Sequence, residues 1–237
     1  MKIRLDKYLA DMGVGTRTEV KRAISKGRVS VDGACVKKPE TKIDTEETTV
    51  VFDGQIVEYT KKEYYMLHKP AGVISATEDA REKTVIDLIV SRKRKDLFPV
   101  GRLDKNSRGL LLMTNQGDLV NQIMRSRYHH EKEYIVRVDR PIDAVFVERM
   151  AAGVYLSELK VTTRPCKVEK LSKFTFRIIL TQGLNRQIRR MCMECGYHVR
   201  DLERVRIMNL TLDGIAEGQY RPITAAEFAE LQKLLRG

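Results

Sequence analysis

The spacing of apolar residues and glycines near the amino terminus constrains the fold more than any other feature of the sequence. Apolar side chains recur over residues 5–12 as on one face of a helix, and Gly13 ends the pattern. Thr16 and Glu19 have the spacing of a capping box, so a second helix is expected just after Thr16. An Asp-Gly pair at 32–33, between alternating apolar residues, is typical of a hairpin. The sequence therefore predicts a small helix–helix–hairpin unit.

Charge is distributed unevenly along the chain. Residues 1–38 contain ten Lys+Arg and four acidic residues, a net charge of +6, whereas residues 39–58 carry −5. A charged connector follows, which predicts a boundary near residue 60 between domains at 1–60 and 61–237. The whole chain of 237 residues carries +12. That excess favours a polyanionic partner, and nucleic acid is the first candidate.

Basic side chains of the amino-terminal unit could form one stripe that contacts phosphates, because several lie one or two helical turns apart. The six candidates are Arg4, Lys7, Arg17, Lys21, Lys26 and Arg28. An ordinary solvated helix surface is the alternative interpretation.

The remaining three quarters of the chain mix short strands with helices. Strands are expected at 134–138 and 174–180, and helices at 144–152 and 224–235. The regular alternation of a parallel βαβ fold is missing, so an α+β domain is predicted. Hydrophobic residues make up 42% of the sequence, enough for a packed core.

No apolar stretch approaches the roughly 20 residues that span a bilayer, and the first residues lack an apolar signal core. We therefore expect a cytoplasmic protein without a membrane partner, whose four cysteines are reduced thiols. Cys192 and Cys195 form a Cys-x-x-Cys pair with His198 nearby, but a zinc site needs a fourth ligand. The pair also falls on an apolar helix face, so we predict buried thiols and no metal site.

The most informative stretch is Gly101–Asn115, where one acidic residue lies among cations beside an apolar strand. Asp104 is flanked by Arg102, Lys105 and Arg108. Nearby cations favour the charged form of a carboxylate, and an ionised, oriented carboxylate can act as a nucleophile or stabilise an ion. A loop with surface ion pairs is the structural alternative.

A second cationic cluster precedes an amphipathic helix that Gly196 ends. Arg186, Arg189 and Arg190 lie near the start of that helix. The helix dipole disfavours cations at this end. Three arginines there therefore need anionic partners, such as phosphates or a buried carboxylate.

These stretches resemble known families. Residues 2–50, with their two helices and the Val-Ser-Val-Asp-Gly hairpin, resemble an S4 RNA-binding domain, which implies binding to structured RNA through the two-helix face. The segments Gly-Arg-Leu-Asp-Lys-Asn-Ser-Arg-Gly-Leu and Asn-Arg-Gln-Ile-Arg-Arg-Met resemble the signature motifs of RNA pseudouridine synthases. Further matches are Lys69–Gly72, His130–Tyr134, Arg206–Asn209 and Gly117–Asn121.

The resemblance is to the branch of this family that carries an S4 domain and modifies ribosomal RNA. It implies a synthase domain with a mixed, largely antiparallel sheet flanked by helices. Within the branch the sequence is most similar to enzymes of the large ribosomal subunit (23S RNA), and those of the small subunit (16S RNA) are the alternative. Ribosomal RNA is thus the expected partner, and a monomer is the expected state.

The family's reaction detaches a uracil from its ribose, rotates it and rejoins it through C5, without a cofactor or net redox change. Asp104 matches the catalytic aspartate, which acts on either the base or the sugar. Arg189 matches the arginine that pairs with it in a bidentate bond, and Arg186 is a less favoured candidate for that role. Tyr134 matches the tyrosine that packs against the base. Arg102 resembles the arginine that fills the space left by a flipped base.

Other basic residues of the two motifs are expected to hold the RNA backbone. They are Lys105, Arg108, Arg186 and Arg190. Two rival functions share parts of this pattern. A non-catalytic RNA-binding or ribosome-assembly factor would not need an aspartate paired with Arg189. A glycoside hydrolase would need a second carboxylate about 5–10 Å from Asp104, and the sequence identifies none.

Overall fold

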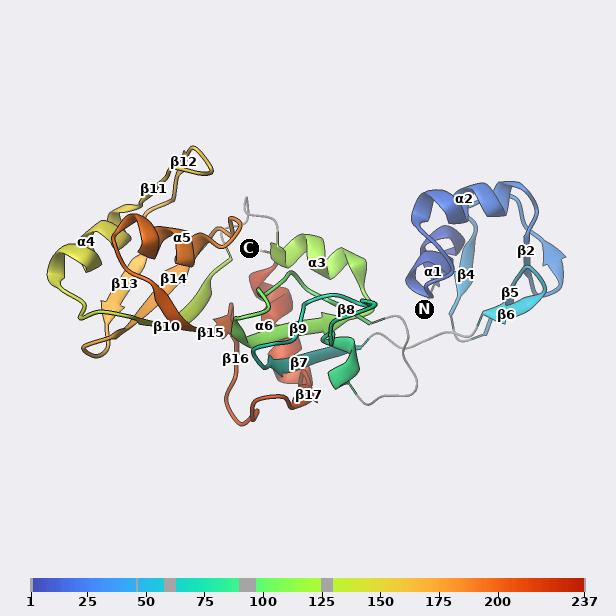
Figure 1. Ribbon diagram of the computed structural model, residues 1–237. Coiled ribbons are helices and arrows are strands. Elements are labelled where there is room, and N and C mark those ends of the chain that lie inside the picture. Colours follow the sequence, from blue (N-terminus) through green and yellow to red (C-terminus); the bar gives the residue numbers. More distant parts are fainter. Residues whose placement is uncertain (1, 46, 58–62, 90–96, 125–129, 237) are drawn as a thin grey trace. The chain divides into compact units, whose positions relative to one another are not determined.

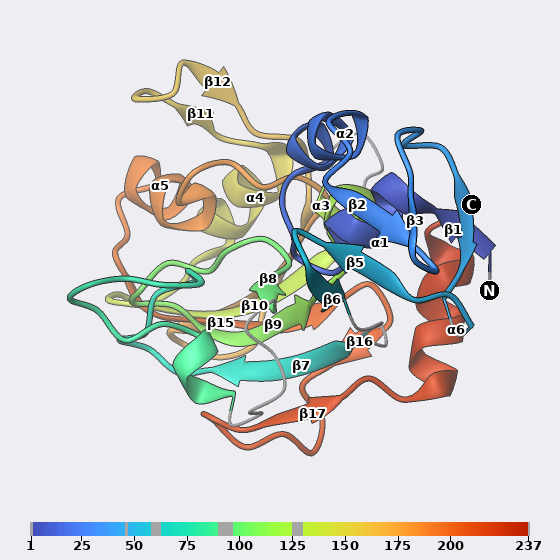
Figure 2. The same ribbon diagram turned by 90° about the vertical axis from the view of Figure 1, so that its right-hand side faces the viewer.

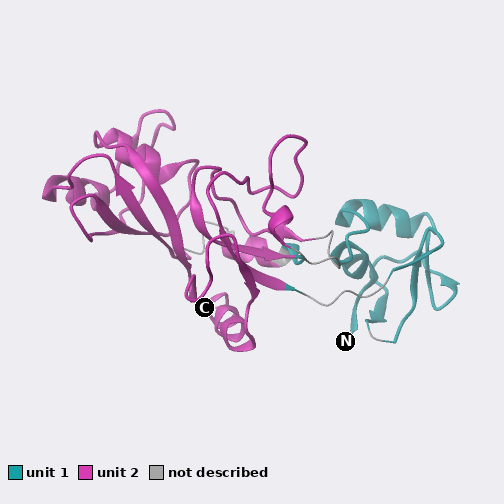
Figure 3. Ribbon diagram, turned by 60° about the horizontal axis from the view of Figure 1, so that its bottom comes forward, with its two compact units in different colours: residues 1–63, 94–96, 115–117 teal, residues 64–93, 97–114, 118–237 magenta. Residues whose placement is uncertain are grey.

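The structure is a computed structural model that describes residues 2–45, 47–57, 63–89, 97–124 and 130–236 (Figure 1). It contains two compact units, one formed mainly by residues 1–63 and one by most of the remainder (Figure 3). Each is described by itself.

The first unit has the predicted helix–helix–hairpin order. Its elements are β1 (Lys2–Arg4), α1 (Leu5–Asp11), α2 (Arg17–Ser25), β2 (Val29–Val31), β3 (Ala34–Cys35), β4 (Lys42–Asp44), β5 (Val50–Phe52) and β6 (Gln55–Val57). Strands β3, β2, β5 and β6 form an antiparallel sheet, and β1 pairs with β4. Thr16 and Glu19 form the predicted capping box at α2. Asp32 and Gly33 have positive φ in the hairpin turn, as a two-residue loop of this type requires.

The second unit is built on one large sheet (Figure 2). Its strands are β7 (Tyr64–Lys69), β8 (Phe98–Pro99), β9 (Arg108–Thr114), β10 (Lys132–Val138), β13 (Lys167–Lys170), β14 (Thr175–Leu180), β15 (Val199–Ile207), β16 (Leu210–Thr211) and β17 (Tyr220–Pro222). The main order is β13-β14-β10-β15-β9-β7-β17, with β8 paired to β9 and β16 to β15. Only the β9–β15 pair is parallel among the described strands, so the predicted mixed, largely antiparallel sheet is confirmed.

Helices flank this sheet. They are η1 (Ile86–Leu88), α3 (Gly117–Met124), α4 (Ala144–Ala152), α5 (Gln187–Glu194) and α6 (Ala225–Leu234), and a separate hairpin is formed by β11 (Tyr155–Leu156) and β12 (Val161–Thr162). Helices α4 and α5 share an apolar core with β10 and β14, whereas α3 and α6 share another with β7 and β9. The sheet thus has two separately packed halves, which meet where β15 lies beside β9.

Gly109 permits this central junction. It pairs with Arg204 across the parallel β9–β15 contact and has a φ of +112°. A Cβ at this position would lie 2.3 Å from the carbonyl oxygen of Arg204. That distance is far inside any van der Waals contact, so only glycine lets the two strands approach this closely.

Candidate active site

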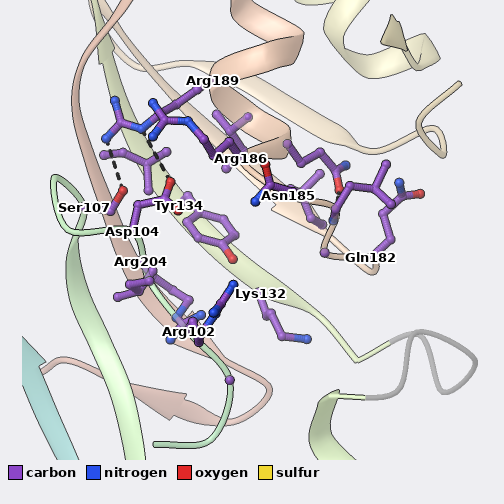
Figure 4. A pocket seen from close by; sticks show the side chains of 18 of the residues that line it. Arg102, Asp104, Ser107, Lys132, Tyr134, Gln182, Asn185, Arg186, Arg189 and Arg204 are labelled. Atoms are coloured by element: carbon purple, nitrogen blue, oxygen red, sulfur yellow. Dashed lines mark hydrogen bonds and ion pairs between the residues drawn. The ribbon is translucent and has the colours of Figure 1, made fainter. Parts of the chain in front are cut away.

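A cavity of about 500 Å³ lies at the junction of the two halves of the sheet (Figure 4). The loop before β9 forms one wall, and the loop between β14 and α5 with the start of that helix forms another. The start of β10 and the middle of β15 complete it. Residues from Gly101 to Arg204 therefore line one space, including members of both motifs identified above.

The cavity is strongly cationic. Among the described residues that line it, Asp104 is the single carboxylate. Five cationic side chains surround it: Arg102, Lys132, Arg186, Arg189 and Arg204. Such a balance attracts an anionic ligand and leaves the carboxylate in a field of positive charge.

Asp104 and Arg189, which both line the cavity, form an ion pair. The Nε atom of Arg189 lies 3.8 Å from Oδ2 of Asp104. The guanidinium also donates from Nη2 to the Asn106 carbonyl at 3.0 Å and to the Ser107 hydroxyl at 3.1 Å. The structure thus brings the two motifs together, but as an ion pair at one oxygen and not as the bidentate bond that was expected. Burial is the main cause that lowers the pKa of Arg189, with Arg186 adding to it.

Hydrogen bonds from Lys69, a residue for which the sequence analysis proposed no role, stabilise the backbone of the loop that carries Asp104. The Lys69 side chain is fully buried. Its Nζ lies within 3.4 Å of the Pro70, Asp104, Lys105 and Ser107 carbonyls. Burial lowers the pKa of Lys69 to about 8, and the charge of Asp104 opposes that effect. Lys69 therefore fixes the backbone that presents the aspartate.

Tyr134 and Arg204 face each other across β10 and β15 at the cavity. They are register partners, next to an irregularity between Glu133 and Tyr134. Lys132 precedes Tyr134 by two residues, so both side chains lie on the same face of β10. Tyr134 is half-buried, whereas Lys132 and Arg204 are buried. The sequence analysis assigned neither Lys132 nor Arg204 to the site. The feature that could have indicated them is a lysine or arginine at a buried position of a strand.

Arg102 and Arg186 also line the cavity, and both are exposed. Arg186 caps α5 in the left-handed conformation, with a φ of 51°. Gln187 supports this turn because its Oε1 accepts a hydrogen bond from the Leu184 amide at 3.0 Å. These contacts set the direction in which α5 presents Arg189.

Three predicted RNA-binding residues are not brought to the cavity. Lys105 is exposed and pairs with Glu82 at 2.7 Å. Arg108 lies 2.8 Å from Asp201 and 2.9 Å from Glu203. Arg190 is involved in a hydrogen-bonded pair with Glu158 and also donates to the Asn185 carbonyl at 3.0 Å. Each of these cations already has an acidic partner within the protein.

The six basic residues of the first unit differ in their surroundings. Arg4 donates to both carboxylate oxygens of Asp6, at 3.0 and 2.8 Å, and Lys21 lies 3.9 Å from the same group. Arg28 pairs with Asp53 through both of its carboxylate oxygens. The other three are placed on or beside the two helices: Lys7 on α1, Arg17 on α2 and Lys26 at the end of α2. Carboxylates therefore offset part of the charge that the sequence assigned to this surface.

The described residues contain no cluster of His, Cys, Asp or Glu arranged to hold a metal ion. Cys192 is buried and Cys195 half-buried, and burial raises the pKa of both thiols. Among the described helices, none is long and apolar enough to cross a membrane.

Two families match this chain. Residues 63–194 match the RNA pseudouridylate synthase family, and residues 3–48 match the S4 domain. A crystal structure of a pseudouridylate synthase superposes with a TM-score of 0.70 and 29% identity, covering 97% of this chain and 99% of that one.

Curated relatives cover nearly the whole chain. The dual-specificity RNA pseudouridine synthase RluF of Escherichia coli K12 is 45% identical over 98% of this chain and 79% of its own length. An uncharacterized RNA pseudouridine synthase, YtzG of Bacillus subtilis, is 36% identical, covering 95% of this chain and 96% of its own length. Ribosomal small subunit pseudouridine synthase A of Yersinia pestis is 34% identical, with 97% and 98% covered.

Proposed function

The chain belongs to the RNA pseudouridylate synthase family, and from this premise we propose that Asp104 carries out uridine isomerisation at a specific site in ribosomal RNA. The observation that carries the assignment is the Asp104–Arg189 ion pair in a cationic cavity. The S4 domain at residues 3–48 supplies a second RNA-binding unit.

The reaction exchanges one bond to the ribose for another. The bond from C1′ to N1 of uracil breaks, the base rotates, and a bond from C1′ to C5 forms; N1 takes up a proton and C5 loses one. Asp104, about one third exposed, can reach a ligand in the cavity. Arg189 holds it in place, and Tyr134 offers its ring to the base.

The target must leave the stacked RNA to reach Asp104, which costs a few kcal/mol. Arg102 is the candidate to fill the vacated space, because it is exposed at the mouth of the same cavity. Arg186 is the candidate for a backbone contact on the opposite wall.

We assign the target to the RNA of the large ribosomal subunit, as the sequence motifs favour, with the small subunit as the alternative. A monomer in the cytoplasm stays a prediction. Mapping pseudouridine in both ribosomal RNAs from a deletion strain identifies the nucleotide: loss of a site in 16S RNA alone would contradict the assignment.

Replacing Asp104 with Asn tests the chemistry. The variant keeps shape but loses the charge, so conversion of uridine should fall by about 10⁴-fold or more. Pseudouridine in a ribosomal RNA fragment is measured after treatment with either protein. Glu78→Gln is the control, since Glu78 is exposed and does not line the cavity. Equal activity of Asp104→Asn and wild type would refute the role of Asp104.

The rival functions receive less support. A non-catalytic binding factor does not account for membership of a synthase family over half of the chain. The described lining residues offer Asp104 no second carboxylate, which a glycoside hydrolase needs.

A further inference from the structure

We propose that Lys132 and Arg204 form a subsite in the cavity for a backbone phosphate of the RNA, next to the nucleotide that is flipped out. The inference rests on the proposed function and deepens it. It assigns a ligand to two side chains that the family motifs above left without a role.

The two cations are placed together by the sheet. Arg204 on β15 is the register partner of Tyr134, and Lys132 lies two residues before that tyrosine on β10. Arg204 is 2% exposed and Lys132 is 7% exposed, yet both line the cavity. Figure 4 shows both beside Tyr134, with Arg102 close to them.

Neither cation is neutralised by the protein. No carboxylate among the described residues lies within 4.0 Å of either group. Arg204 donates from Nε to the Leu110 carbonyl at 2.7 Å, but its Nη2 is buried without a hydrogen-bond partner. Lys132 has a single long contact, 3.3 Å from Nζ to the His130 carbonyl. Two adjacent buried charges with unfilled hydrogen-bonding capacity are costly unless a ligand supplies the anion.

Lys69 shows that burial of a lysine is not sufficient for this conclusion. Its Nζ has four backbone carbonyls around it, and it does not line the cavity. Lys132 has the opposite combination of one weak contact and access to the cavity. Burial first, and Arg204 second, lower the pKa of Lys132 to about 8, whereas a bound anion would raise it.

Phosphate is the ligand because phosphates are the anionic groups of an RNA substrate. Uracil carbonyls are neutral and could not offset two charges. The cavity already provides Asp104 and Tyr134 for the sugar and base, so a phosphate attached to the same sugar would enter the space beside them. Charge-assisted contacts from an arginine and a lysine would then fix the depth to which the nucleotide enters.

The test is a cycle between one phosphate and one side chain. A ribosomal RNA fragment with the mapped target is prepared with single neutral methylphosphonates at each position around that uridine. For wild type, one replacement should lower kcat/KM by about 10- to 100-fold, as for a lost charge-assisted hydrogen bond. For Lys132→Met the same replacement should have no further effect, because its partner is gone. Lys132→Arg should restore the sensitivity.

Arg137→Met is the matched control, since Arg137 is an exposed cation on the same strand; it should behave as wild type. Equal penalties for wild type and Lys132→Met at every position would overturn the subsite. If Lys132→Met fails to fold, Lys132→Gln takes its place, and equal penalties for wild type and Lys132→Gln at every position would overturn the subsite. A uniform response of wild type to all replacements is also incompatible with a phosphate held by two buried cations. Failure of the proposed function is a separate result: wild type would leave uridine in the unmodified fragment unconverted.

Discussion

The cations of the first unit and those of the cavity have the same charge but different surroundings. Lys21 and Arg28 are about half exposed, and each lies near a carboxylate. Lys132 and Arg204 are almost fully buried, and no carboxylate of the described residues lies within 4.0 Å of either charged group. Exposed charges are screened by salt and hold a polyanion without fixing one geometry. Buried charges that lack such partners within the protein act at one position and require a ligand there. The first unit is thus suited to hold RNA, and the cavity to orient one nucleotide.

The largest effect on this comparison is expected from a substitution that forces apart β9 and β15, the two strands that meet beside the cavity. Gly109→Ala would place a methyl group 2.3 Å from the Arg204 carbonyl oxygen, at a φ of +112°. We expect the second unit to lose about 4 kcal/mol or more of stability, measured by urea unfolding. Gly117→Ala is the control, because nothing lies within 4 Å of its added Cβ. A Gly109→Ala variant as stable as wild type would mean that the junction is not tightly packed.

Removing the partner of Asp104 should separate catalysis from binding. Arg189→Gln is expected to lower kcat by about 10³-fold, because it leaves a carboxylate without its charge partner. RNA affinity should change little, since exposed cations supply most of it. Single-turnover kinetics and filter binding measure the two quantities. Arg186→Gln is the comparison: a larger loss of kcat there than in Arg189→Gln would transfer the role to Arg186.

The burial of Lys132 can be tested through pH. Its pKa is about 8 in the folded protein, against the ordinary 10.5. Between these values the unfolded chain binds a proton that the folded protein has released, so this group makes the protein more stable as pH rises from 8 to 10.5. The difference in unfolding free energy between wild type and Lys132→Met should rise over that window, by at most about 1.4 kcal/mol per pH unit. If this difference in unfolding free energy did not change with pH, Lys132 would be solvent-exposed in the folded protein. Arg137→Met should give no slope, since arginine stays protonated.

The smallest effects are expected on the first unit. Lys26 is exposed at the end of α2, and Arg28 is already paired with Asp53. Lys26→Ala should weaken RNA binding a few-fold and reduce the salt slope by about one ion. Arg28→Ala should reduce the slope less, because Asp53 offsets its charge. Titrations of an RNA fragment at several salt concentrations measure both. Equal reductions would show that the Asp53 pair opens when RNA binds.

The sequence predicted the local elements well. The capping box at Thr16 and the Asp-Gly hairpin turn were confirmed, as were the helices predicted at 144–152 and 224–235, which are α4 and α6. Each depends on contacts between residues a few positions apart, so the pattern is readable in the chain. The motifs around Asp104 and Arg189 were also recognisable, because their order is specific.

The sequence alone determined the family, the two functional motifs and the excess of positive charge. The tertiary structure decided which cations are free to meet RNA. Arg108 and Arg190 stand in the motifs but are paired with Asp201 and Glu158, residues that the chain brings close only after folding. Lys132 and Arg204 received no role from the sequence, and it is the pairing of β10 with β15 that places them beside one cavity. Burial and neutralisation of charge depend on long-range packing, and neither can be read from local spacing.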